Sequence, residues 1–194
     1  MALMAEVLLL HHVLGLTEGI TAFADELRGA GHVVTVPDLY DGATFATIEE
    51  GFAHAKRLGE DLDARAEEAV SGLSERLVYA GFSMGAMTAH QLAQTLPGAR
   101  GALLYHHGDV PVDTFGDTWP EGVDLQIHVA AGDPFYETDV VEDFVQRAGA
   151  TASAEVFVYP GSAHLFTDSS LSDYDADATA LVVQRSLDLL DRVS

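Results

Sequence analysis

The clearest local indication of the fold class is the stretch LVYAGFSMGA, residues 77–86. Its first part, Leu77–Phe82, is a short apolar run typical of a buried strand, and a stretch of helical character follows it. Between the two, Gly81-Phe82-Ser83-Met84-Gly85 fits the pattern G-x-S-x-G, in which a sharp strand-to-helix turn exposes a nucleophilic serine. The flanking glycines avoid side-chain clashes in so tight a turn, and the Met84 backbone N–H at the helix start can point at a developing oxyanion. A glycine-rich turn with an incidental serine is the alternative interpretation.

Short apolar runs and longer helical stretches alternate along the whole chain. This alternation is typical of a parallel sheet covered on both faces, so we expect an α/β fold with about six mostly parallel strands in a single domain over residues 1–194. The expected strands are Ala5–Leu10, Val33–Pro37, Leu77–Phe82, Ala99–Tyr105, Leu125–Ala131 and Ala154–Tyr159. The expected helices are Gly19–Ala30, Ile48–Ser71 with a break near Gly59, Gly85–Thr95, Val140–Ala148 and Asp175–Val193. Loops at the carboxyl ends of parallel strands meet in one crevice, and the functional residues are expected there.

Two residues downstream of Ser83 complete a candidate catalytic triad. A serine hydroxyl is a poor nucleophile until a base removes its proton, so the motif predicts a histidine and an orienting carboxylate. Asp133 follows the apolar strand that ends near Ala131, and His164 follows the strand that ends at Tyr159. Taken singly, Asp133 could be a turn or capping aspartate and His164 a surface histidine. Their order and their equivalent positions past strand ends favour the triad Ser83, Asp133 and His164.

Composition excludes several classes of partner and chemistry. The 194 residues carry 9 Lys plus Arg against 31 Asp plus Glu, a net charge of −22, which disfavours nucleic acid and anionic membranes as partners. The chain has no cysteine, so disulfides, thiolate metal sites and cysteine nucleophiles are excluded. The first ten residues lack a basic region, and their apolar run ends at His11, so we expect neither a signal peptide nor a membrane span, and a cytoplasmic protein.

Several segments together resemble the dienelactone hydrolase family of the α/β-hydrolase fold. They are the first loop His11–Leu16, the signature Pro37-Asp38-Leu39-Tyr40, the elbow Gly81–Gly85, the acid turn Ala131-Gly132-Asp133 and the histidine loop Ala163–Phe166. The resemblance covers nearly the whole chain. It implies that the Val13 backbone N–H is a second oxyanion donor beside Met84, and that Tyr40 lines the pocket. Because only two helical stretches fit between Tyr40 and Ser83, we expect no large cap domain.

The chain departs from the family pattern at three places. The family's nucleophile is a cysteine, where this chain has Ser83. The family has a glutamate before the oxyanion residue, where this chain has His12. The family binds its substrate's carboxylate with arginine, one lying shortly after the catalytic histidine, where this chain has Leu165-Phe166-Thr167-Asp168. The missing cation and the acidic surplus favour a neutral ester, lactone or thioester over an anionic dienelactone.

Two histidine pairs, His11-His12 and His106-His107, follow strands that end near the expected crevice. Neighbouring residues at a strand end tend to point to opposite sides, so we expect one of each pair, with His12 and His106 as candidates, to contact substrate. Polar lining with structural hydrogen bonds and a metal site are the alternatives. Trp119, in the irregular loop Gly108–Gly122, is a candidate lip over the site, or else it fixes the loop to the body of the protein.

The sequence therefore predicts a serine hydrolase that cleaves a small ester, lactone or thioester through an acyl-enzyme, without a cofactor, as a monomer or homodimer. A non-catalytic scaffold that binds a small ligand and a metal-dependent hydrolase that uses the histidine pairs are the alternatives.

Overall fold

The six expected strands form one wholly parallel sheet in the computed structural model, which describes residues 4–194. The three residues before Met4, part of the expected single domain, lie outside the described residues. The sheet order is β2-β1-β3-β4-β5-β6. The strands are β1 (Glu6–Leu10), β2 (Val33–Thr35), β3 (Leu77–Phe82), β4 (Gly101–Tyr105), β5 (Asp124–Ala130) and β6 (Ala154–Tyr159). The α/β class and the six strands are thus confirmed.

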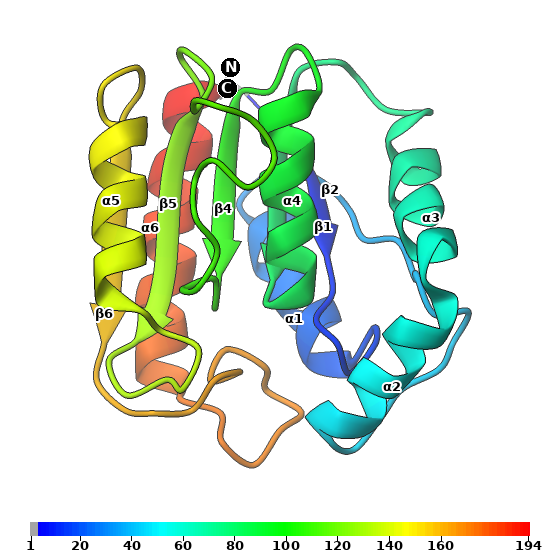
Figure 1. Cartoon of the computed structure of the whole chain (residues 1–194). Coiled ribbons are helices and arrows are strands. Elements are labelled where there is room, and N and C mark those ends of the chain that lie inside the picture. The colour runs from blue at the N-terminus through cyan, green and yellow to red at the C-terminus, as the bar shows by residue number, and fades with distance from the viewer. Residues whose placement is uncertain (1–3) are drawn as a thin grey trace.

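Helices cover both faces of this sheet (Figure 1). They are α1 (Glu18–Gly29), α2 (Ile48–Leu58), α3 (Glu60–Val70), α4 (Met84–Thr95), α5 (Thr138–Ala148) and α6 (Ala176–Val193). Helices α1 and α6 pack on one face, and α2 to α5 lie on the other. The expected break near Gly59 is confirmed, because Gly59 has a φ of 52° between α2 and α3. Within residues 4–194, no large cap covers the sheet.

The strands are apolar on both sides because both faces are buried. Along β1, Val7 and Leu9 belong to the core beneath α1 and α6, whereas Leu8 and Leu10 belong to the core beneath α4 and α5. This alternation is the two-residue period of a strand, and burial on both faces explains why the sequence shows a continuous apolar run.

Strand β2 is shorter than the sequence predicts. The expected strand Val33–Pro37 ends at Thr35, and it pairs with β1 over three residues only. It is the edge strand of the sheet, and Pro37 has no N–H to give to a neighbour, so the pairing stops before it.

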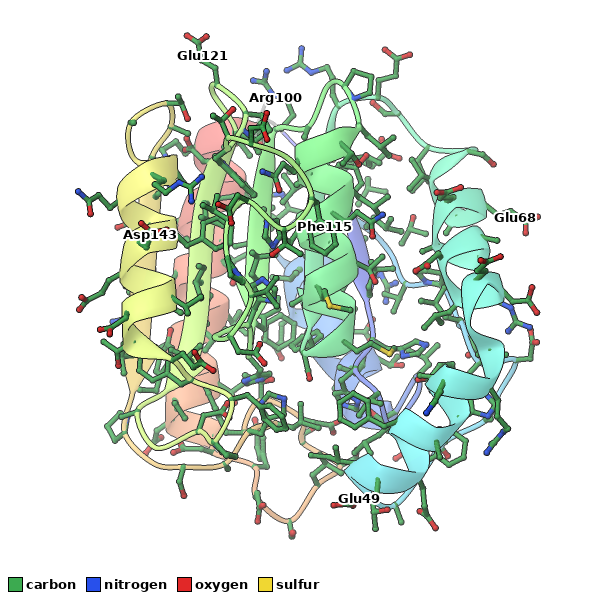
Figure 2. The ribbon with its side chains drawn as sticks, viewed as in Figure 1. Glu49, Glu68, Arg100, Phe115, Glu121 and Asp143 are labelled. Carbon is green, nitrogen blue, oxygen red and sulfur yellow. The ribbon has the colours of Figure 1, made fainter. Side chains whose placement is uncertain are left out.

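Many acidic side chains lie on the outside of the molecule, whereas Asp133 and Asp168 are buried. Figure 2 shows Glu49, Glu68 and Glu121 pointing away from the ribbon, and all three are exposed. Among residues 4–194, no helix combines the length and the apolar character that crossing a membrane requires.

Candidate active site

The turn between β3 and α4 holds Ser83 in a strained backbone conformation. Its φ is 53°, in the left-handed region that non-glycine residues seldom adopt, and its N–H is fixed by a 2.8 Å hydrogen bond to the Tyr105 carbonyl. A Cβ at Gly81 would collide with the Gly85 carbonyl oxygen, and one at Gly85 would lie 2.5 Å from the carbonyl oxygens of both Leu10 and His11. Glycine is therefore required at both positions, because the turn packs backbone against backbone.

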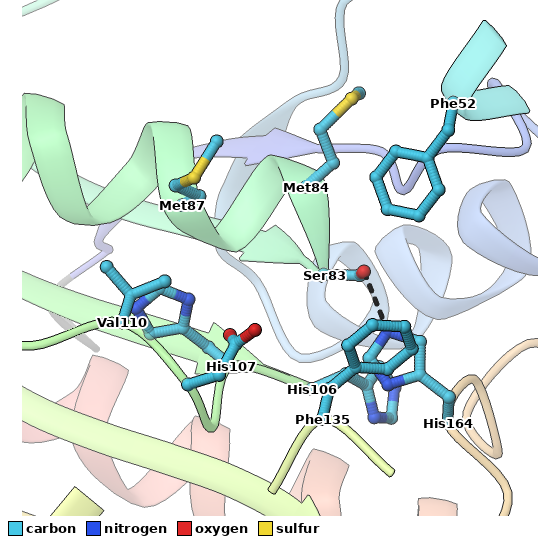
Figure 3. A pocket seen from close by; sticks show the side chains of 10 residues that line it. Phe52, Ser83, Met84, Met87, His106, His107, Val110, Phe135 and His164 are labelled. Carbon is cyan, nitrogen blue, oxygen red and sulfur yellow. Dashed lines mark hydrogen bonds between the residues drawn. The ribbon is translucent and has the colours of Figure 1, made fainter. Parts of the chain in front are cut away.

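Ser83, His164 and Asp133 form a continuous hydrogen-bonded chain. The Ser83 hydroxyl lies 2.7 Å from Nε2 of His164, and Nδ1 of the same ring lies 2.7 Å from Oδ2 of Asp133 (Figure 3 shows the first bond). An ionised carboxylate such as Asp133 can accept hydrogen bonds but cannot donate them. Nδ1 of His164 therefore carries the proton, and Nε2 of the same ring is free to accept the serine proton. The fold brings these three residues together although Ser83 lies 81 positions, and Asp133 lies 31 positions, before His164 in the sequence.

Backbone bonds connect the loops that carry the acid and the base. The Gly132 N–H donates to the Gly161 carbonyl at 2.8 Å, so the turn after β5 lies against the turn after β6. Oδ1 of Asp133 accepts from the Phe135 N–H at 2.8 Å. Asp133 thus also has the turn role that sequence allowed, and that turn holds its second oxygen against His164.

Val13 packs in the same apolar cluster as Met84, the residue after Ser83. Met84 is the first residue of α4, where a helix leaves its N–H groups without internal partners and concentrates positive potential. Val13, in the loop after β1, donates to no protein acceptor within residues 4–194. These are the two amides expected to form the oxyanion hole.

A cavity of about 160 Å³ opens at Ser83. Figure 3 shows Ser83 and His164 in its wall, with the apolar side chains of Phe52, Met84 and Phe135 around them. The full lining is Phe52, Ser83, Met84, Met87, His106, His107, Asp109, Val110, Phe135 and His164. Ser83 and His164 therefore face a space that is large enough for a small molecule.

Comparison with known proteins identifies the relationship. The sequence model of the dienelactone hydrolase family matches residues 3–194. The chain belongs to the dienelactone hydrolase family. This makes it a hydrolase of the α/β-hydrolase fold that acts on ester bonds. No curated protein matches the chain significantly.

Solved structures share the fold at low sequence identity. The dienelactone hydrolase-like promiscuous phosphotriesterase P91, from metagenomic libraries, superimposes with a TM-score of 0.73 at 20% identity, over 97% of this chain and 86% of that one. A phospholipase/carboxylesterase from Dyadobacter fermentans gives 0.63 at 18% identity, over 94% and 90%. Esterase 2 from Thermogutta terrifontis, in a form phosphorylated by paraoxon, gives 0.63 at 14% identity, over 98% and 83%.

Two departures of this dienelactone hydrolase family member from the family pattern contact each other. Nε2 of His12, where the family has glutamate, lies 2.8 Å from Oδ2 of Asp168, in the stretch where the family has arginine. Both side chains are 1% exposed. His12 Nδ1 accepts the Leu14 N–H at 3.2 Å, so Nε2 carries the proton and donates it to the carboxylate. The pair joins the loop of Val13 to the loop of His164.

Asp168 is held ionised by this environment. Burial raises the pKa of its carboxyl, but hydrogen bonds from His12, Ser170 and Thr17 outweigh burial and lower the pKa to about 2. Since His12 is engaged with Asp168 and does not line the cavity, the structure differs from the expectation that it contacts substrate.

Both members of the other pair, His106 and His107, line the cavity. One of the two was expected to face it. His106 has a φ of 57°, and this left-handed residue breaks the alternation of side-chain direction at the end of β4. His11 instead points into the protein, where Nδ1 contacts the His12 carbonyl at 2.8 Å and Nε2 accepts the Leu39 N–H at 3.1 Å. Burial lowers the pKa of His11 to about 4, so it is neutral.

The histidines do not gather into a metal site. Within residues 4–194, no group of three or more His, Asp or Glu side chains is arranged to hold a metal ion. The arrangement therefore favours the structural and cavity-lining interpretations of the two pairs over the metal site.

Tyr40 and Trp119 lie outside the cavity lining, in contrast to the sequence prediction. Tyr40 is buried behind it and donates its hydroxyl to Sδ of Met84 at 3.5 Å, and burial raises its pKa to about 12. Trp119 is 2% exposed in the core, and its Nε1–H donates to the Val123 carbonyl at 2.6 Å. Trp119 thus fixes the loop Gly108–Gly122 to the body, which was the alternative interpretation.

Half of the residues that line the cavity were not predicted from the sequence to contact substrate, although the metal-site alternative included Asp109 as a possible ligand. Asp109 and Val110 follow β4, and Phe135 follows Asp133 by two positions, so the rule of strand ends points to all three. Met87 lies one turn into α4. Phe52 has no such signal, because it reaches the cavity from α2, whose position over the sheet is decided by tertiary packing.

Proposed function

We propose that the protein is a serine hydrolase that cleaves a small neutral or cationic ester, lactone or thioester through an acyl-enzyme on Ser83. The observation that carries the proposal is the hydrogen-bonded chain Ser83–His164–Asp133, with both bonds at 2.7 Å, in the wall of a cavity. The strained turn, with glycine required on both sides, supports it further, because strain of this kind is kept where it exposes a reacting group.

In the first step, Ser83 Oγ attacks the substrate carbonyl carbon while its proton moves to Nε2 of His164. The carbonyl oxygen becomes an oxyanion, which the N–H groups of Val13 and Met84 stabilise. Collapse of this intermediate breaks the bond to the leaving alcohol or thiol, which takes the proton from His164. Asp133 keeps the ring in the required tautomer and stabilises its charged form.

In the second step, water replaces the alcohol. His164 takes a proton from water, the hydroxide attacks the acyl carbon, and the tetrahedral intermediate collapses to the carboxylic acid. The proton returns to Ser83 Oγ, so that the enzyme is regenerated and one water is consumed for each ester bond broken.

The cavity supports the exclusion of anionic substrates. Its lining contains one carboxylate, Asp109, and no Lys or Arg. A dienelactone carboxylate would have no counter-charge here and would lie in the field of a chain of net charge −22. A cytoplasmic setting and a monomeric or homodimeric state remain predictions.

Turnover of p-nitrophenyl acetate by wild type and Ser83→Ala tests the proposal. We expect a burst of one p-nitrophenolate per chain followed by turnover, and loss of both in Ser83→Ala, leaving only the residual rate that an oxyanion hole provides. Ser71→Ala, an exposed serine at the end of α3, is the matched control and should behave as wild type.

Covalent labelling gives an independent measurement. The Thermogutta terrifontis neighbour is phosphorylated by paraoxon, so we expect paraoxon or a fluorophosphonate to modify Ser83 and to abolish turnover. Unchanged activity in Ser83→Ala, or activity lost to a chelator but not to a fluorophosphonate, would refute the serine mechanism. A folded protein that neither turns over esters nor is labelled would favour the non-catalytic scaffold.

A further inference from the structure

The cavity beside Ser83 offers hydrogen-bond acceptors but no cationic side chain. Apart from Ser83 and His164, its polar lining consists of His106, His107 and Asp109. The other lining residues, Phe52, Met84, Met87, Val110 and Phe135, are apolar. The charge and protonation of the polar residues therefore determine which charge and which hydrogen-bonding groups a substrate needs to bind in this cavity.

A chain of hydrogen bonds fixes the tautomer of His107. The two N–H groups of the Gln94 side chain are shared among the carbonyl oxygens of Val112, Gly116 and Thr118, which lie 2.8, 3.0 and 2.9 Å from the nitrogen. Oε1 therefore faces His90 as an acceptor. His90, whose pKa burial lowers to about 4, is neutral and donates from Nε2 to this oxygen at 3.0 Å.

His90 Nδ1 is consequently an acceptor. It lies 3.2 Å from Nε2 of His107, which must be the donor. Burial lowers the pKa of His107 well below its usual range, so the ring is neutral and Nδ1 carries a lone pair instead of a proton. No hydrogen bond from residues 4–194 reaches this atom, and the ring forms part of the cavity wall (Figure 3).

Asp109 adds a carboxylate without a counter-ion. It appears in none of the ion pairs of the described residues. Asp109 is exposed at the cavity mouth, and partial burial still raises its pKa. Its own backbone N–H and His164 lower the pKa, and the like charges of Glu137 and Asp133 raise it. A cation in the cavity would relieve this repulsion.

Aromatic rings also line the cavity. Phe135 packs against His164, with ring centroids 4.5 Å apart, and Figure 3 shows Phe52 on the far side of Ser83 from His107. The faces of aromatic rings attract ammonium groups within about 6 Å of the ring centre. The net charge of −22 also raises the local concentration of cationic substrates.

We infer that the preferred substrate is an ester that carries a protonated amine, with the ammonium charge facing Asp109 and its N–H facing Nδ1 of His107. This inference rests on the proposed serine hydrolase function and names its substrate class.

The experiment compares isosteric esters that differ in charge. On the alcohol side, these are 2-(dimethylamino)ethyl acetate, protonated at the pH of the assay, and 3-methylbutyl acetate. On the acyl side, they are methyl 4-(dimethylamino)butanoate and methyl 5-methylhexanoate. Each kcat/KM is divided by the rate constant for alkaline hydrolysis of the same ester, because an ammonium group activates the carbonyl by itself. We expect a preference of about two- to fivefold for the amine in at least one pair, the scale of one charge pair with an exposed partner such as Asp109.

The variant Asp109→Asn should remove most of this preference, whereas Glu121→Gln should keep it. Glu121 is exposed and lies at the end of the sheet where β5 begins, away from the cavity, so it controls for the loss of one negative charge from the whole chain. Acetylcholine, which has the charge but no N–H, should be a poorer substrate than 2-(dimethylamino)ethyl acetate, because it cannot donate to His107.

The outcomes separate the two proposals. Neutral esters hydrolysed in a Ser83-dependent manner with no amine preference would overturn the substrate class and leave the serine mechanism standing. An equal loss of preference in Asp109→Asn and Glu121→Gln would also overturn it, because the effect would then come from net charge alone. Absence of any Ser83-dependent hydrolysis would overturn both.

Discussion

Removal of the Asp168 carboxylate should destabilise the protein strongly without closing its cavity. Asp168 is 1% exposed, and its two oxygens accept four hydrogen bonds. Oδ2 accepts from His12 Nε2 at 2.8 Å and from the Thr17 hydroxyl at 2.6 Å, and Oδ1 accepts from the backbone N–H of Ser170 at 2.8 Å and from the Ser170 hydroxyl. Asp168→Ala leaves the His12 N–H buried without an acceptor.

The magnitude follows from the kind of contact that is lost. A buried donor left without an acceptor costs about 1–3 kcal/mol, and Asp168→Ala removes the acceptor of both the His12 N–H and the Ser170 backbone N–H. A typical domain has about 5–15 kcal/mol of stability in total. We therefore expect the free energy of unfolding, measured by urea titration at pH 7, to fall by about 2–6 kcal/mol for the two donors together, with an unchanged dependence on urea.

A double-mutant cycle isolates the pair. In His12→Phe/Asp168→Ala no unpaired donor remains at His12, so the double variant should be at least about 1 kcal/mol more stable than the sum of the single effects predicts. Additive effects would show that the His12–Asp168 contact does not stabilise the fold as a pair. Because Asp168 does not line the cavity but holds the loop of Val13, kcat should fall in Asp168→Ala more than KM rises.

The pH dependence of the same contact has a defined sign. The pKa of Asp168 is lowered to about 2 from 3.8, so its contribution is complete above the unfolded value and is lost as pH falls from about 4 through 2. Asp168→Ala should therefore unfold less steeply with acid than wild type over that window.

Three further predictions follow from other parts of the molecule. Gly85→Ala should abolish most ester turnover, because its Cβ would lie 2.5 Å from two carbonyl oxygens, whereas Gly72→Ala, with no atom within 4 Å of its Cβ, should retain it. Trp119→Phe should lower the free energy of unfolding by about 1–3 kcal/mol, because the Val123 carbonyl loses its donor, and kcat/KM should be unchanged. A changed kcat/KM would indicate that Trp119 contacts the substrate after all. The free energy of unfolding, measured with urea, should fall as pH falls from 6.5 to 4. Buried neutral histidines with lowered pKa values take up protons only when the protein unfolds. Each of them lowers the free energy of unfolding by up to about 1.4 kcal/mol per pH unit. The histidines concerned are His11, His90, His106, His107 and His128; a flat stability profile over that range would contradict their neutral burial.

Local patterns along the chain were sufficient to predict the sheet and the order of the triad. A strand buried on both faces leaves a continuous apolar run, and the elbow Gly81–Gly85 needs its glycines wherever it occurs, so both are visible in sequence. Parallel strands end at one edge, which is why Asp133 and His164 were predicted to approach Ser83 from their positions after strands alone.

Tertiary structure decided which side chains reach the cavity. The left-handed φ of His106 lets both His106 and His107 face the cavity, and no pattern in the sequence predicts this backbone conformation. Burial of Trp119 and the approach of Phe52 from α2 depend on how helices and loops pack over the sheet. His12 and Asp168 are 156 positions apart, and only the fold shows that these two departures from the family pattern are one contact. Secondary structure follows from periodicity over a few residues, whereas the contents of a pocket depend on loop conformations that distant segments impose on one another.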